Sequence, residues 1–173
     1  TLIKEDGTGK VDANAYADVA DGDAYHEGHL YATAWTGASA GNKAAALVMA
    51  TRLIDAEFQF GGTRANEVQA LQWPREDCRD PDADGWDGGT VSEDVVPRGV
   101  IDATCETARA LIIEDRTANP LGEGLKFSGL GDLQQSFDKA DRRPVIPHVA
   151  QAMLRKFGEP IVARSGTVKL VRS

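Results

Sequence analysis

Three acidic side chains alternate along one short stretch of the sequence, with the spacing found at the head of an EF-hand calcium loop. Asp80, Asp82 and Asp84 occur in DPDADGWDGG, which spans residues 80–89. A complete loop also needs a bidentate Glu at its twelfth position and a helix on each side. Counted from Asp80, the twelfth residue is Val91. We therefore expect a solvated Asp and Gly turn at this position, with no metal site and no cofactor.

Two other short motifs resemble a phosphate loop and a zinc site, but both lack required residues. GTGK at residues 7–10 lacks the first Gly and the final Ser or Thr of a Walker loop. HEGH at residues 26–29 places two His three positions apart instead of four, and no third ligand is evident. We interpret these His as surface residues at a helix end. His148 has no identifiable catalytic partner, so we expect a protein that is not an enzyme.

The tripeptide WPR at residues 73–75 could contact nucleic acid. A residue before Pro is extended, which directs the Trp73 indole across the chain. The indole could stack on bases of single-stranded DNA while Arg75 binds a phosphate. The alternative is a core Trp that anchors a loop, and the absence of a surrounding basic field favours this alternative.

The charge balance is acidic. The chain carries 27 Asp and Glu against 19 Lys and Arg, which gives a net charge of −8. The cations are scattered, with local clusters at residues 142–143, 155–156 and the last ten positions. Because phosphate neutralisation drives nucleic-acid binding, this balance argues against DNA as a tightly held ligand. No apolar run approaches the length of a membrane span, and the polar start indicates no signal peptide.

Apolar periodicity predicts a mainly α fold, a compact helical protein of about four helices. The expected helices cover residues 14–27, 39–58, 97–115 and 147–158. In the third helix, Cys105 is expected in the core, whereas Asp102, Glu106 and Arg109 are expected on the solvated side. A small β-hairpin is expected within residues 125–137, with its turn at residues 129–132. Residues 1–158 would form one domain, and residues 159–173 an extended, strand-prone C-terminal arm.

Several motifs occur in a fixed order that resembles one protein family. They are EDGTGKVDANAYADVADGDAY, then Trp35, ALVMATRLID, FGGTR, LQWPR followed by DxDG, and VVPRGVIDATCETA. Together they resemble small tailed-phage and prophage proteins labelled putative DnaT-like single-stranded DNA-binding proteins. That family is similar to the head–tail connector, or adaptor, proteins of long-tailed phages.

The resemblance to adaptors implies a structural virion protein, assembled in the host cytoplasm and located in the neck. Its expected partners are further copies of itself in a dodecameric ring, the portal protein and the next neck or tail-completion protein. Genomic DNA would pass through the lumen without tight binding, and no membrane would be involved. The portal-binding arm would use Ile161, Val162, Arg164, Val168, Lys169, Leu170, Val171 and Arg172.

A contact loop would present Asp80, Asp82, Asp84 and Trp86 to the next protein of the neck. The alternative function is a replication-associated protein that binds single-stranded DNA through Trp73 and Arg75.

Overall fold

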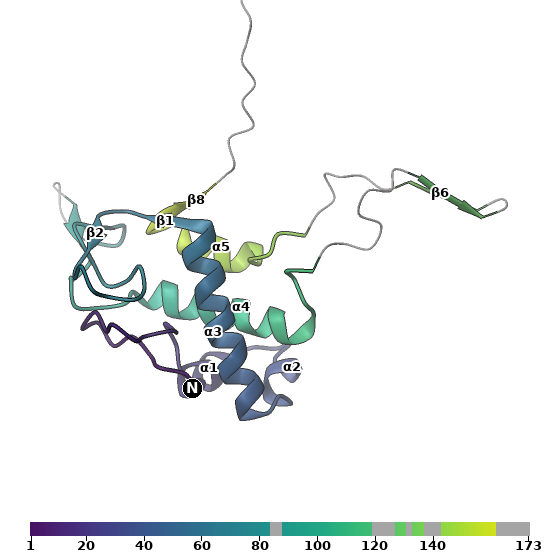
Figure 1. Cartoon of the computed structure of the whole chain (residues 1–173), viewed down its shortest axis with the longest axis horizontal. Coiled ribbons are helices and arrows are strands. Elements are labelled where there is room, and N and C mark those ends of the chain that lie inside the picture. Colours follow the sequence, from purple (N-terminus) through teal and green to yellow (C-terminus); the bar gives the residue numbers. More distant parts are fainter. Residues whose placement is uncertain (84–87, 119–126, 131–132, 137–142, 162–173) are drawn as a thin grey trace, which may run out of the picture.

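The computed structural model of the chain describes residues 1–83, 88–118, 127–130, 133–136 and 143–161 (Figure 1). Within these residues there are five helices: α1 (Val19–Glu27), α2 (Thr33–Thr36), α3 (Ala40–Glu57), α4 (Arg98–Ile113) and α5 (His148–Leu154). The strands are β1 (Phe58–Phe60), β2 (Thr63–Arg64), β3 (Arg75–Glu76), β4 (Arg79–Asp80), β5 (Gly89–Thr90), β6 (Phe127–Leu130), β7 (Leu133–Ser136) and β8 (Gly158–Pro160). They form four two-stranded antiparallel sheets. The fold is therefore mixed α and β, and the prediction of a mainly α fold was correct only for the helical part.

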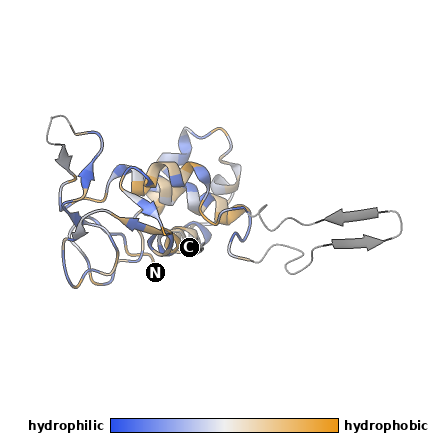
Figure 2. Ribbon diagram, turned by 90° about the horizontal axis from the view of Figure 1, so that it is seen from above, coloured by the Kyte–Doolittle hydropathy of each residue, from blue (hydrophilic) through white to orange (hydrophobic). Residues whose placement is uncertain are grey.

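Helices α3 and α4 cross at the centre of the molecule, and the other helices pack around α4 (Figure 1). One core cluster lies where α3, α4 and α5 meet the loop that carries Trp73. A second cluster surrounds Trp35 of α2 and joins α3 to the middle of α4. Figure 2 shows that the hydrophobic residues concentrate where the helices meet, whereas the connecting loops are mostly hydrophilic. None of the described helices is long and apolar enough to cross a membrane.

The helix starts follow from local capping. The Ser39 side chain accepts a hydrogen bond from the Asn42 N–H at 3.2 Å, which caps α3 where the sequence predicts it. In contrast, α1 begins at Val19, five residues later than predicted. Asp18 and Asp21 form a reciprocal capping box there. The Asn14 side chain instead accepts from the Ile3 N–H at 2.8 Å, which holds the N-terminal segment against the body.

Helix α4 buries the predicted face but also one residue expected in solvent. Cys105 is fully buried, as predicted. Glu106, however, is only 4% exposed. The segment after α1 covers it and places the His29 ring 3.7 Å from its carboxylate, while Arg109 contacts its other oxygen. Helical periodicity alone could not reveal this covering loop.

The small sheets join distant parts of the chain. Strand β1 pairs with β8 so that Phe58 lies opposite Pro160 and Phe60 opposite Gly158. The first residues of the predicted C-terminal arm are therefore part of the folded body. Strands β6 and β7 form the predicted hairpin, and Leu130 pairs with Leu133, so the paired strands extend into the stretch that was predicted as the turn, residues 129–132.

Candidate nucleic-acid interface

The structure places Trp73 and Arg75 in the interior. The Trp73 side chain has no exposed surface and packs edge-on against Phe60 and Phe157, at ring-centroid distances of 5.6 and 5.9 Å. Arg75 donates hydrogen bonds to the carbonyl oxygens of Gly61 at 2.6 Å and Gly62 at 2.7 Å. The interpretation of Trp73 as a core residue that anchors a loop is confirmed. Neither side chain is available to stack on a base or bind a phosphate.

A buried polar network fixes the same loop. The Tyr16 hydroxyl donates a hydrogen bond to the Asp55 carboxylate and accepts from the N–H groups of Gln72 at 3.1 Å and Trp73 at 3.3 Å. Burial raises the pKa of Asp55 to about 6, although the hydrogen bond from Tyr16 opposes this shift. The network supports the position of Trp73.

The phosphate-loop motif at residues 7–10 is already occupied by a carboxylate from the same chain. Buried Glu5 accepts hydrogen bonds from the N–H groups of Gly7 at 2.9 Å, Gly9 at 3.0 Å and Lys10 at 2.8 Å. Successive backbone N–H groups of this kind form an anion-binding nest. Glu5 fills it, so the motif has a structural role.

Of the two His of the HEGH motif, His26 does not lie on the surface as predicted, whereas the His29 side chain is 25% exposed just after the end of α1. His26 is 1% exposed and packs between the rings of Tyr25 and Trp35, because α1 lies against the rest of the second core cluster. Its Nε2 atom lies 3.2 Å from the Cys105 carbonyl oxygen, and burial lowers its pKa. In the described parts of the chain, no group of three or more His, Cys, Asp and Glu could hold a metal ion.

The clearest candidate interface follows α5 and the residues at its two ends. Residues 142–158 contain four Lys and Arg and no Asp or Glu, so all 27 acidic residues lie elsewhere in the chain. The residues of this stretch that are exposed in the structure are Arg143, His148, Val149, Ala152, Arg155 and Lys156. From His148 onward their spacing places them on one face of the helix. The two basic pairs were visible in the sequence, and the absence of acidic residues between them was the further signal that could have located this face.

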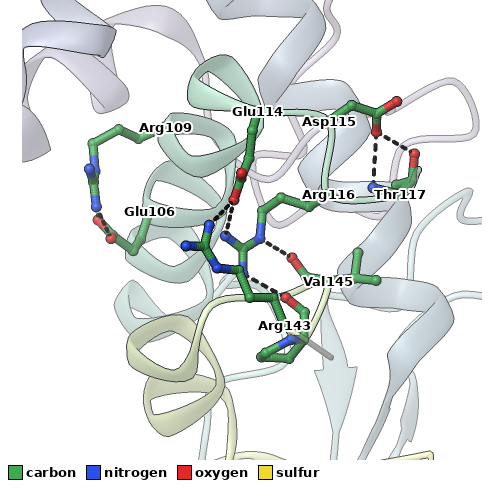
Figure 3. Close-up of polar contacts among 9 residues, drawn as sticks. Glu106, Arg109, Glu114, Asp115, Arg116, Thr117, Arg143 and Val145 are labelled. Atoms are coloured by element: carbon green, nitrogen blue, oxygen red, sulfur yellow. Dashed lines mark hydrogen bonds and ion pairs between the residues drawn. The ribbon is translucent and has the colours of Figure 1, made fainter. Parts of the chain in front are cut away.

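Arg143 is held at the N-terminal end of this face by polar contacts with the end of α4 (Figure 3). Its guanidinium lies 2.6 Å from the Glu114 carboxylate. Arg116 also contacts Glu114 and donates hydrogen bonds to the carbonyl oxygens of Pro144 at 2.6 Å and Val145 at 2.9 Å. These contacts fix the backbone before α5, yet the Arg143 side chain remains 77% exposed.

At the opposite end of α5, Lys156 stands beside an open cleft of about 520 Å³. Its ammonium group lies 3.2 Å from the Asp82 carboxylate, and both side chains are more than half exposed. The cleft separates the C-terminal end of α5 from the start of α4 and from β4. Its lining residues are Asp80, Asp82, Val91, Pro97, Arg98, Gly99, Asp102, Met153, Lys156 and Phe157.

Only part of the predicted contact loop and arm lies within the described residues. Asp80 and Asp82 line the cleft, whereas Asp84 and Trp86 lie outside the description. Ile161 is 55% exposed, and its N–H donates a hydrogen bond to the Glu57 carbonyl oxygen at 2.7 Å. The remaining predicted arm residues lie outside the described residues: Val162, Arg164, Val168, Lys169, Leu170, Val171 and Arg172.

Comparison with known proteins identifies the family of the chain. A family model described as "Putative DnaT-like ssDNA binding protein" matches residues 1–173. The chain belongs to this family. The family named from the sequence motifs is therefore confirmed over the whole length of the DnaT-like chain. No match was found among curated proteins or among solved structures.

The family match corrects the main functional prediction. Its description concerns single-stranded DNA binding and supports the alternative function instead of a head–tail adaptor. The predicted portal and neck partners, and the passage of DNA without tight binding, are therefore wrong for this DnaT-like chain. The adaptor prediction rested on the resemblance to head–tail connectors, and the acidic net charge was taken as an argument against tight DNA binding. Local charge on one face, however, governs the contact with phosphates.

Proposed function

We propose that this chain binds single-stranded DNA along the exposed face of α5, from Arg143 to Lys156, without catalysing a reaction. The observation that carries the proposal is the absence of Asp and Glu from residues 142–158 of an otherwise acidic protein. Cations at both ends of the helix can bind phosphates, which supply most of the sequence-independent affinity for nucleic acid. Family membership supports the same function.

The two ion pairs at the ends of α5 do not prevent this use of the cations. Arg143 pairs with Glu114 and Lys156 with Asp82, but in each pair the side chains are substantially exposed. Exposed ion pairs contribute little to stability, typically about 0 to 1 kcal/mol. A phosphate can therefore replace either carboxylate at small cost.

The middle of the α5 face is apolar and can contact the sugar and base of a nucleotide. Val149 is 56% exposed, and Ala152 lies one turn further along the same face. The apolar surface formed by the small side chains of Val149 and Ala152 lies between Arg143 at one end and Arg155 and Lys156 at the other. The seven-residue helix is roughly 10 Å long, which exceeds the length of a single nucleotide. The face therefore has room for a few nucleotides and favours no particular sequence.

The test is the salt dependence of binding to a fluorescently labelled oligo-dT, measured by anisotropy. For single strands, each phosphate contact contributes about 0.7 to the slope of log K against log salt concentration. The double variant Arg155→Ala with Lys156→Ala should bind more weakly at low salt. Its slope should be smaller by about 1.4, because two phosphate contacts are lost.

The control is Arg52→Ala, which removes one exposed cation from α3, away from the α5 face. This control should retain both the affinity and the slope of the parent chain. An equal loss per removed charge in the control and in the double variant would show that the overall charge governs binding and would overturn the assignment to the α5 face. No binding of oligo-dT by the parent chain at low salt would overturn the proposed function itself.

A further inference from the structure

The cleft beside Lys156 has an apolar floor and a charged rim. Met153 lies in the last turn of α5 and Phe157 in the turn that follows it, Val91 follows β5, and Pro97 precedes α4. The Phe157 ring lies at 85° to the Trp73 ring, with the ring centroids 5.9 Å apart, and this contact fixes its orientation. Half-buried Phe157 thus offers a fixed aromatic surface within a space of about 520 Å³.

The backbone of α4 approaches this aromatic surface closely. A Cβ atom at Gly99 would lie 2.9 Å from Cε2 of Phe157. A side chain at this position would therefore displace the ring or fill the space beside it. The Phe157 ring therefore packs directly against the α4 backbone, which holds this aromatic surface in place.

A phosphate can replace a carboxylate in the ion pairs at the rim of the cleft. Lys156 holds Asp82 at 3.2 Å, and Arg98 holds Asp102 at 2.7 Å. A phosphate that binds Lys156 releases the Asp82 carboxylate at the mouth of the cleft. Asp80 keeps this loop in place by accepting a hydrogen bond from the Asp82 N–H at 3.0 Å.

A released carboxylate accepts hydrogen bonds and donates none. It therefore favours bases that present a hydrogen-bond donor over bases that present an acceptor at the same position. Cytosine presents an exocyclic amino group that pairs with Asp or Glu, whereas thymine presents a carbonyl oxygen at the same position. A carboxylate beside the thymine oxygen would meet another acceptor. The chemistry of the rim therefore distinguishes these two pyrimidines, which are similar in size and stacking area.

We infer that the cleft binds a nucleobase with an exocyclic amino group, stacked on Phe157 and hydrogen-bonded to Asp82, while Lys156 binds its phosphate. This inference rests on the proposed function and adds a base preference to it. The strand along α5 supplies the base, since Lys156 belongs to both the α5 face and the rim of the cleft.

The test compares the affinities of the parent chain for oligo-dC and oligo-dT of equal length at neutral pH and low salt. Oligo-dC should bind roughly fivefold more tightly, the equivalent of about 1 kcal/mol for one base contact. In Asp82→Ala this ratio should fall to about one, while the affinity for oligo-dT stays unchanged or rises because a negative charge has been removed.

The control is Glu67→Ala, which removes an exposed negative charge from a loop that does not line the cleft. It should leave the ratio of the two affinities at its parent value. Equal binding of oligo-dC and oligo-dT by the parent chain, or an unchanged ratio in Asp82→Ala, would overturn the inference but leave the proposed function standing. Binding of neither oligonucleotide would instead mean that the proposed function has failed.

Discussion

Residue environment, more than residue type, decides what the conspicuous side chains of this chain do. Trp73 and Arg75 have the chemistry to bind a nucleotide, but the fold uses the indole as core and the guanidinium to bind carbonyl oxygens. Arg155 and Lys156 lie in an unremarkable helical stretch, yet their side chains are exposed. The pair Arg155 and Lys156 differs from the pair Trp73 and Arg75 in its exposure to solvent, and the local sequence is a poor predictor of exposure.

Asp55 provides a pH test of the buried network. Burial raises its pKa from 3.8 to about 6, so the folded protein binds this proton more tightly than the unfolded chain does. The resulting stabilisation is complete below pH 4 and is lost as the pH rises through about 6. Across this window the free energy of unfolding should fall by roughly 2 kcal/mol on account of Asp55. Asp55→Asn should lack this fall, as measured by urea denaturation between pH 4 and 7.

The comparison with Asp55→Asn isolates one group. His26 and Glu57 also have shifted pKa values because of burial, and both titrate in the parent chain and in the variant. The difference between the two curves therefore reports Asp55 alone. A difference that does not vary with pH would show that Asp55 keeps an ordinary pKa in the folded protein.

At the scale of elements, α1 packs against α2 through a position that has no side chain. A Cβ at Gly22 would lie 2.3 Å from Cζ2 of the fully buried Trp35 ring. We expect Gly22→Ala to destabilise the protein by about 1 to 3 kcal/mol through overpacking, despite the better helix propensity of Ala. Chemical denaturation of the parent chain and the variant measures this difference.

Gly28 at the end of α1 is the matched control. A Cβ there would meet no atom within 4 Å, and the residue has a φ of −90°, which any amino acid can adopt. Gly28→Ala should therefore change the free energy of unfolding by less than about 0.5 kcal/mol. Equal destabilisation by both substitutions would point to the backbone of α1 and not to the contact with Trp35.

Local patterns predicted the elements whose formation depends on local physics. The apolar stripes of α3 and α4, the Ser39 cap and the β6–β7 hairpin were all readable from nearby residues. Helix α2 has only four residues, too few to show a helical period. The pairing of β1 with β8 joins positions about one hundred residues apart, and no local pattern encodes it. The cleft depends on the same long-range packing, so its position could not be predicted.

At the scale of the whole molecule, the acidic and basic residues are segregated. Seven of the 19 Lys and Arg lie in residues 142–173, together with only one of the 27 Asp and Glu. The acidic remainder repels DNA and should confine a bound strand to the α5 side. This segregation was visible in the sequence, whereas the choice of α5 as the presenting element required the fold.

Two truncated chains distinguish the contribution of the C-terminal residues to stability from the contribution of their positive charges to DNA binding. A chain that ends at Ile161 keeps β8 and the hydrogen bond from Ile161 to Glu57, but it loses Arg164, Lys169 and Arg172. It should melt close to the parent temperature. If these three cations contact phosphates, its salt slope for oligo-dT should be smaller by about 2.

A chain that ends at Phe157 also loses β8, which leaves the backbone groups of β1 without their strand partner. Gly158 packs closely there, since a Cβ at this position would lie 2.4 Å from the Gln59 carbonyl oxygen. We expect a fall of several degrees in Tm for this chain alone, measured by circular dichroism. Equal melting of the two truncated chains would show that β8 contributes no stability. An unchanged salt slope in the chain that ends at Ile161 would restrict the DNA contacts to residues before 162, where the exposed cations at the two ends of α5 lie.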